Sequence, residues 1–191
     1  MRFTCALFLL ATALSAQNPT CNKCSGTYIP SSEVQAYIKR APDDAVADQQ
    51  VRAVDVGKSH VDIGVVYRGK KTAGGAVAEH DRVSEVYHVI DGSATLVLGS
   101  DISGWKARPP DDRAVRLLNG PGGNGVSINH GATYDLKPGD VVIIPAGVGH
   151  WFTKIDDHIS YLMVRVDPDK VTPLKDEAAS KADLAAGYSG R

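Results

Sequence analysis

The sequence has few of the residues that mark disulfide frameworks, nucleic-acid binding or membrane insertion. Its 191 residues include only three cysteines, and aromatic residues make up 6%. The 21 Lys and Arg residues are balanced by 22 Asp and Glu residues, so no basic surplus exists to bind a phosphate backbone or an anionic membrane. Beyond residue 17, no apolar run is long enough to span a bilayer. These absences argue against nucleic-acid and membrane partners, and the length fits one ordinary domain.

The N-terminal segment has the composition of a secretory signal peptide. Arg2 precedes an apolar stretch from Phe3 to Ser15 that is too short for a transmembrane helix and ends in small residues. We therefore predict a signal peptide at residues 1–17 and a secreted or periplasmic protein. A buried N-terminal helix or strand is the alternative.

Removal of that segment would leave Cys21 and Cys24 as the remaining cysteines. In an oxidising compartment, such a close C-x-x-C pair is most simply a local disulfide. The surrounding residues offer neither a second C-x-x-C for zinc nor the strand-to-helix context of a redox motif. We predict a disulfide between Cys21 and Cys24.

The rest of the chain predicts an all-β domain with a short helix before it and a helical tail after it. Residues 31–40 have helical periodicity and end before Pro42. From residue 50 onward, short apolar and alternating runs are separated by Gly- and Asp-rich turns, as in an antiparallel sandwich or barrel. After an imperfect strand from residue 50, the predicted strands are Val61–Tyr67, Val83–Ile90, Ser93–Leu98, Val126–Asn129, Val141–Ile144, His150–Lys154 and Ile159–Val166.

These elements divide the chain into four predicted segments. They are the signal peptide at 1–17, a leader with one helix at 18–48, the barrel at 49–168, and a tail at 169–191. Between residues 102 and 125 lies a long polar insertion, which is either a functional loop at the barrel mouth or a surface excursion.

Two segments carry residues that could perform chemistry. In residues 79–92, His80 precedes a strand whose alternation places Glu85 on one face. In residues 139–152, His150 opens another strand. If both faces point into the barrel, one carboxylate and two imidazoles converge. Two neutral histidines and one carboxylate are the ligands that Fe(II), Mn(II) or Zn(II) sites use when positions stay open for substrate.

Both segments resemble the motifs of the cupin superfamily. The second resembles the motif G-x5-P-x-G-x2-H through Gly139, Pro145, Gly147 and His150. The first resembles the form H-x-H-x4-E-x6-G through His80, Glu85 and Gly92. The resemblance covers about Val51 to Val166 and implies a double-stranded β-helix barrel.

The chain departs from the cupin pattern at positions that matter for metal binding. Ala78 stands where cupins usually carry the first histidine, and Lys154 replaces the final asparagine of the second motif. The usual set of three histidines and one glutamate would therefore be reduced to His80, Glu85 and His150. The resemblance implies a divalent transition metal (Fe, Mn, Zn or Ni) held by these three ligands, with lower affinity than four would give.

An alternative register would bring Glu79 and Asp81 opposite the two histidine positions and create a carboxylate-rich site. We favour the first register because it keeps the histidine match at His80.

The aromatic and sulfur residues of the predicted strands are candidates to line the cavity beside the metal, or simply to fill the barrel. They are Tyr67, Tyr87, Phe152, Tyr161 and Met163. Among the other histidines, His88 is predicted at a surface or interface, His130 in a turn at the mouth, and His60 and His158 in loops.

The resemblance leaves two functions open. The favoured one is a metal-dependent cupin enzyme that acts on a small organic substrate by oxygenase, isomerase or lyase chemistry, with the catalytic residues beyond the metal ligands unknown. The alternative is a non-catalytic cupin that binds a sugar or another small ligand, with or without a metal. In a barrel that has lost its metal, His80 or His150 could still serve as a general acid or base. Cupins often form dimers through an edge strand or an N-terminal segment, so a homodimer is an option by analogy.

Overall fold

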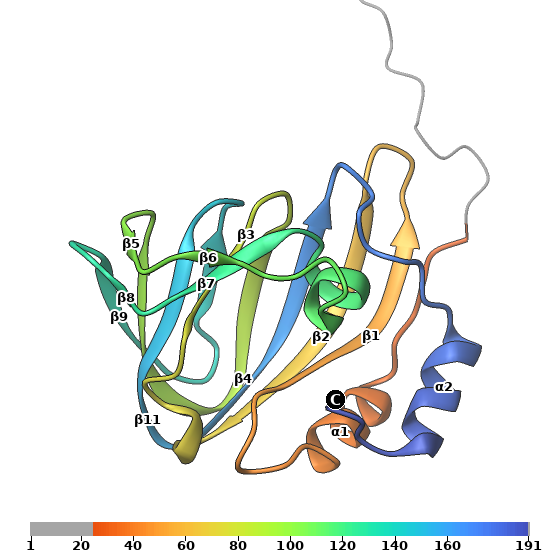
Figure 1. Ribbon diagram of the computed structural model, residues 1–191. Helices are drawn as coiled ribbons and strands as arrows, with labels where there is room; N and C mark the ends of the chain where they lie inside the picture. The colour runs from red at the N-terminus through yellow and green to blue at the C-terminus, as the bar shows by residue number, and fades with distance from the viewer. Residues whose placement is uncertain (1–24, 191) are drawn as a thin grey trace, which may run out of the picture.

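The computed structural model describes residues 25–190 (Figure 1). The predicted signal peptide at 1–17 and the Cys21–Cys24 pair lie outside the described residues, so both stay predictions. Within the described part of the chain, no helix is long and apolar enough to cross a membrane.

Two long strands organise the barrel, β4 (Ser84–Gly99) and β11 (Gly149–Asp167). They pair antiparallel along most of their length. β4 bends at Gly92, where φ is +80° and a side chain would collide with the backbone of His158. β11 changes register between Ile155 and Ile159, opposite this bend. The turns predicted at Asp91–Gly92 and Asp156–Asp157 are therefore bends inside continuous strands, and the flanking predicted strands merge.

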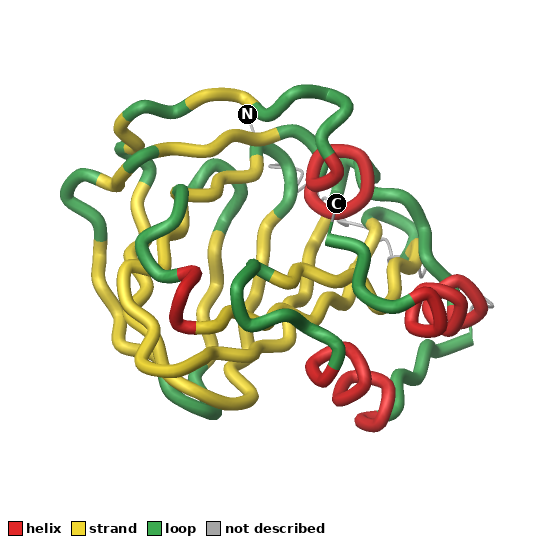
Figure 2. Tube along the Cα trace, turned by 60° about the horizontal axis from the view of Figure 1, so that its bottom comes forward, coloured by secondary structure: helices red, strands yellow, loops and turns green. Residues whose placement is uncertain are grey.

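The bends divide one nine-stranded sheet into two halves that face each other. In the first half, the order is β1-β2-β11-β4-β10, with β1 (Ala47–Asp55), β2 (His60–Gly69) and β10 (Val141–Ile144). In the second, it is β9-β4-β11-β3-β7-β6, with β9 (Ala132–Leu136), β3 (Val77–His80), β7 (Gly122–Gly125) and β6 (Lys106–Ala107). β5 (Ile102–Ser103) and β8 (Ser127–Ile128) form a separate ladder. Figure 2 shows the strands enclosing the interior.

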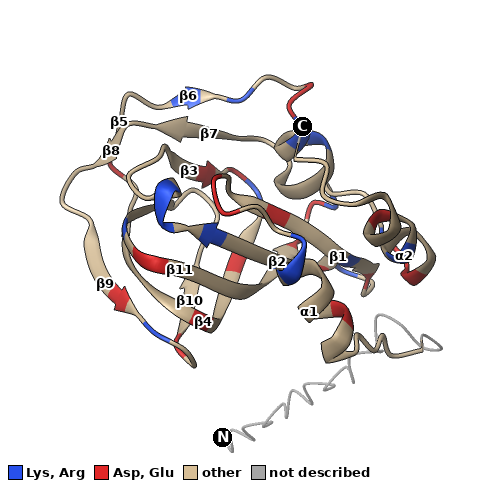
Figure 3. Ribbon diagram, turned by 90° about the horizontal axis from the view of Figure 1, so that it is seen from below, with Lys and Arg blue, Asp and Glu red and all other residues tan. Residues whose placement is uncertain are grey.

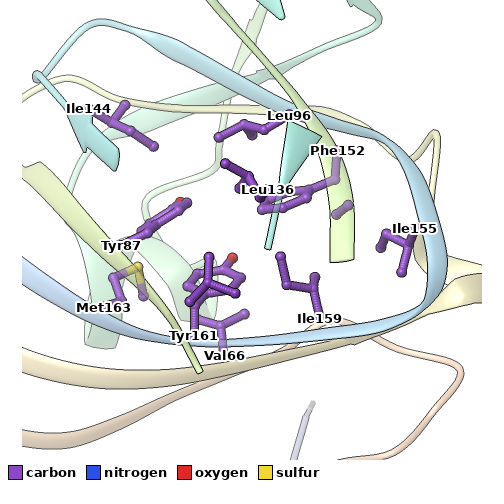
Figure 4. Packing of buried hydrophobic residues seen from close by; sticks show 12 residues of the cluster. Val66, Tyr87, Leu96, Leu136, Ile144, Phe152, Ile155, Ile159, Tyr161 and Met163 are labelled. Carbon is purple, nitrogen blue, oxygen red and sulfur yellow. The ribbon is translucent and has the colours of Figure 1, made fainter. Parts of the chain in front are cut away.

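The main apolar core lies between the two halves (Figure 4). Tyr87 and Met163 project from the first half, and Leu96 and Phe152 project from the second. All four are at most 3% exposed. Burying a side chain of this size stabilises the fold by about 1.5–3 kcal/mol.

Two helices cover the outer face of β1 and β2. They are α1 (Ser31–Lys39) and α2 (Glu177–Ala186). Tyr37 of α1 is fully buried against Val51 and Val65, and its hydroxyl lies 2.8 Å from the hydroxyl oxygen of Ser180 in α2. The chain termini of the described region are thus held against the barrel by a second, smaller core.

The predicted fold class, an all-β barrel with a short helix before it and a helix after it, is confirmed. β3, β9 and the short strands of the 102–125 insertion are not among the predicted strands. The insertion also contains one π-helical turn at Val115–Asn119. β7 has the sequence Gly-Gly-Asn-Gly, which lacks the β-branched and aromatic residues that mark strands. Lys and Arg positions are interspersed with Asp and Glu positions along the elements, in keeping with the balanced composition (Figure 3).

Candidate metal centre

His80, Glu85 and His150 meet between the two halves of the barrel. His80 ends β3, Glu85 lies near the start of β4, and His150 lies near the start of β11. The Nε2 atom of His80 is 3.5 Å from Oε1 of Glu85, and Nε2 of His150 is 3.7 Å from Oε2 of Glu85. The three ligand atoms all lie within 4.8 Å of one another, and all three residues are buried. The structure therefore brings together the three residues that the sequence predicted as metal ligands.

The 102–125 insertion closes the barrel beside this cluster. Its strand β7 pairs with β3, and Gly122 lies opposite His80. A Cβ atom at Gly122 would lie 2.3 Å from the carbonyl oxygen of Glu79, so only glycine allows this close approach. The insertion is thus part of the wall around the cluster.

Burial and charge set the protonation states of the cluster. Burial lowers the pKa of His80 to about 3, and it also lowers the pKa of His150. Burial alone would raise the pKa of Glu85, but the two imidazoles, the Arg165 guanidinium and the Tyr87 hydroxyl together bring it down to about 2. At neutral pH, the cluster therefore contains two neutral imidazoles and one carboxylate, the forms that bind a metal cation.

The spacing of the donor atoms fits a divalent transition metal with small adjustments. In a tetrahedral site, metal bonds of 2.0–2.2 Å place neighbouring ligand atoms roughly 3.3–3.6 Å apart, close to the 3.5 Å from His80 Nε2 to Glu85 Oε1 and the 3.7 Å from His150 Nε2 to Glu85 Oε2. The Nδ1 atom of His150 lies 3.5 Å from the carbonyl oxygen of Val148, a contact that leaves Nε2 free to accept. Nδ1 of His80 has no hydrogen-bond partner in the described region, so this imidazole lacks the usual orienting contact.

A family model for the AraC-like ligand-binding domain, a cupin-related family, matches residues 122–184. The match covers about a third of the chain. The antiparallel barrel of two facing halves has the cupin fold. No curated protein sequence matches the chain.

Three solved structures are similar to this cupin at low sequence identity. A Bacillus halodurans protein is 13% identical, with a TM-score of 0.42 over 81% of this chain and 93% of its own. The DMSP lyase DddQ of Ruegeria pomeroyi is 20% identical, with a TM-score of 0.38 over 66% and 48% of the two chains. The oxalate decarboxylase of Lactobacillus farciminis is 16% identical, with a TM-score of 0.41 over 68% and 31%.

The fourth ligand position of this cupin is an alanine on the same face of β3 as His80. Ala78 lines the cavity beside the cluster and pairs across the sheet with His150. The alternative register is wrong: Glu79 accepts a hydrogen bond from Trp105 Nε1 at 3.0 Å, and Asp81 is exposed. Neither acidic residue reaches the cluster.

The cluster opens on a cavity of about 150 Å³. Of the predicted lining residues, Tyr87, Tyr161 and Met163 line it. Phe152 lies one layer away in the core, stacked on Tyr161 with 5.7 Å between ring centres. The prediction for Tyr67 is wrong, because its side chain alternates to the other face of β2, stacks on His158 and donates a hydrogen bond to Asp43.

Two of the other histidines also differ from prediction. His60 is not in a loop: it begins β2, is buried, and its Nδ1 lies 3.0 Å from the carbonyl oxygen of Thr172. His158 is part of β11, at its bend, because β11 continues through the predicted turn. His88 is exposed on β4, as predicted. His130 is exposed in a bend with φ of +53°, and its place at the barrel mouth stays a prediction.

Five polar residues around the cavity were not predicted. Asp48, Arg68, Arg108 and Asn119 line it, and the fully buried Arg165 donates a hydrogen bond from Nε to Oε1 of Glu85 at 3.2 Å. Arg68 and Arg165 lie at inward-facing positions of strands β2 and β11. A charged residue at an otherwise apolar, inward-facing position is a sequence pattern from which both could have been predicted. Arg108 and Asn119 lie in the insertion, whose sequence carries no comparable signal.

Proposed function

We propose that this cupin binds a divalent transition metal through His80, Glu85 and His150 and acts on a small organic molecule. The observation that carries the proposal is the meeting of two neutral imidazole nitrogens and one ionised carboxylate, all buried, at the wall of a cavity. This donor set suits Fe, Mn, Zn or Ni, and three protein ligands leave positions free. A bound metal would polarise a substrate oxygen or present O2, which fits oxygenase, isomerase or lyase chemistry.

The protein residues around the cluster orient its carboxylate. Tyr87 donates a hydrogen bond to Oε2 of Glu85 at 2.8 Å, and Arg165 holds Oε1. Burial raises the pKa of Tyr87 and of Tyr161. Both phenols therefore stay protonated at neutral pH, where they act as hydrogen-bond donors and not as bases.

The size of the cavity limits the substrate. At about 30 Å³ for each water, a volume of about 150 Å³ corresponds to about five waters. Cavities for drug-sized ligands are larger, about 300–1,000 Å³. A ligand held entirely inside this cavity would therefore be smaller than a drug-sized molecule.

Metal analysis of protein purified without chelators tests the proposal. Wild-type protein supplied with Zn, Mn, Fe or Ni should carry about one metal per chain, and His150→Ala should bind it at least about tenfold more weakly. His88→Ala is the matched control, because His88 is exposed on β4 and should leave the metal content unchanged.

Two results would contradict the proposal. One is a wild-type protein that binds none of the four metals, and the other is a His150→Ala protein that retains a full equivalent. A metal-free wild type that still bound a small ligand would instead support the non-catalytic alternative.

A further inference from the structure

Arg68 is a guanidinium at the cavity without a counterion. It lies near the end of β2, its Nε donates a hydrogen bond to the Tyr161 hydroxyl at 3.1 Å, and its guanidinium carbon lies 4.5 Å from the centre of the Phe152 ring. Among residues 25–190, no carboxylate lies within ion-pair distance of it, and its two terminal nitrogens have no hydrogen-bond partner. The Phe152 ring and the Tyr161 hydroxyl thus hold the guanidinium in place, while its two terminal nitrogens remain able to donate hydrogen bonds to a ligand.

The carboxylates that line the cavity are already engaged by another residue. Arg165 pairs with Glu85 through Nε at 3.2 Å and with Asp48 through Nη2 at 2.5 Å. Arg68 and Arg108 line the cavity, and neither forms an ion pair with a carboxylate among residues 25–190. The arginines that line the cavity are therefore left without a carboxylate of their own.

A second polar group at the cavity also lacks a partner. Asn119, from the insertion, is 5% exposed, and its side-chain oxygen has no hydrogen-bond partner in the described region. A buried polar atom of this kind is normally satisfied by water or a ligand. The cavity is therefore built for a polar occupant, with an arginine fork on one side and an amide on another.

We propose that Arg68, held by Tyr161, anchors a small organic carboxylate in this cavity. The inference rests on the proposed function for the reaction, and it names the substrate class. A planar guanidinium fork matches a carboxylate with two parallel hydrogen bonds, and the cavity volume admits only small acids. Tyr161 and Tyr87 connect the two ends of the site, because their ring centres lie 4.4 Å apart. The Tyr161 hydroxyl accepts a hydrogen bond from Arg68, and the Tyr87 hydroxyl donates one to Glu85.

Binding of acetate, glycolate and malonate to the full protein tests the anchor, with acetamide as the neutral analogue of acetate. Affinities would be measured by ligand-observed NMR or calorimetry, both with metal and after its removal. Wild-type protein should bind at least one of the acids and should bind acetamide at least about tenfold more weakly than acetate. Arg68→Gln should lower the affinity for the acids about tenfold or more, and Arg68→Lys should lower it less.

Two controls separate this inference from the metal proposal. Arg82→Gln removes an exposed arginine that pairs with Asp169, and it should leave carboxylate binding unchanged. Arg68→Gln should keep the metal content of the wild type, whereas His150→Ala should lose metal and keep carboxylate binding in the metal-free state.

The anchor is refuted if acetamide binds as tightly as acetate, if none of the three acids binds, or if folded Arg68→Gln binds the acids like wild type. Should Arg68→Gln fail to fold, Tyr161→Phe provides the second variant, because it removes the hydrogen bond that orients Arg68 while keeping the ring. It should weaken carboxylate binding severalfold, and unchanged affinity there would also refute the inference.

Discussion

Asp62 on β2 is a fully buried carboxylate whose charge the surroundings disfavour. Neither of its oxygens has a hydrogen-bond partner among the described residues. Burial raises its pKa from the ordinary 3.8 to about 6, although the nearby Thr172 hydroxyl and the positive charge of Arg165 work in the opposite direction. At neutral pH, Asp62 is therefore an ionised group in a site that prefers the protonated form. We predict that Asp62→Asn, which keeps the shape and removes the charge, stabilises the protein.

The magnitude follows from the difference between the folded and unfolded pKa of Asp62. Each pH unit of difference is worth about 1.36 kcal/mol, so a pKa of about 6 against 3.8 corresponds to roughly 3 kcal/mol. Between these values, the folded protein binds more protons than the unfolded chain, so the stability contributed by this group is present below pH 3.8 and is lost as the pH rises to about 6. Asp62→Asn should therefore match wild type near pH 4 and exceed it by about 3 kcal/mol above pH 7.

Urea unfolding followed by fluorescence of the two tryptophans would measure this difference at pH values from about 4 to 8, with EDTA present so that metal binding does not contribute. Asp111→Asn, at an exposed position of the insertion, is the matched control and should change stability by less than about 0.5 kcal/mol at every pH. The reasoning is refuted if Asp62→Asn is no more stable than wild type at pH 7.5, or if its advantage does not depend on pH.

Two further substitutions test the site and the helix packing. Ala78→His would place a third imidazole beside His80, and we expect at least about tenfold tighter metal binding in competition with a chromogenic chelator; unchanged affinity would contradict the assigned ligand position. Arg52 forms a buried ion pair with Glu33 at 2.9 Å. Arg52→Met should therefore cost about 3–5 kcal/mol of unfolding free energy, and the double variant with Glu33→Leu much less, whereas equal losses would show that charge burial is not the cause.

Much of the candidate site was predictable because the residues that form it lie at fixed positions in short motifs. Gly139 lies in the turn before β10, and Pro145 and Gly147 lie in the turn between β10 and His150. Period-two alternation places Glu85 and Tyr87 on one face of β4. These motif positions and the alternation along a strand each depend only on residues that are close together in the sequence. The convergence of His80, Glu85 and His150 then follows from the fold that the motifs imply.

The residues that alternation and motifs could not supply are those placed by long-range pairing. Arg108 and Asn119 reach the cavity because the glycine-rich β7 adds to the edge of β3. Because glycine has a low propensity for β-strands, the sequence predicted a loop for this insertion. Tyr67 was misplaced for a related reason: it lies one residue before Arg68, and alternation alone does not say which of two neighbouring residues faces inward.

The residue that pairs with Glu85 across the sheet depends on register shifts between β4 and β11, which the hydrophobic pattern of the sequence does not reveal. In the second half of the barrel, Phe152 pairs with Leu96, and that register, continued without a shift, would place Met163 opposite Glu85. The register shifts between Phe152 and Tyr161 together move the pairing by two residues, so that Arg165 lies there instead. A shift by two residues keeps every side chain on its own face, so the apolar core is preserved while the residue beside the carboxylate changes from a thioether to a guanidinium. The register shifts in the middle of β11 thus decide which residue lies beside the carboxylate of the candidate metal centre.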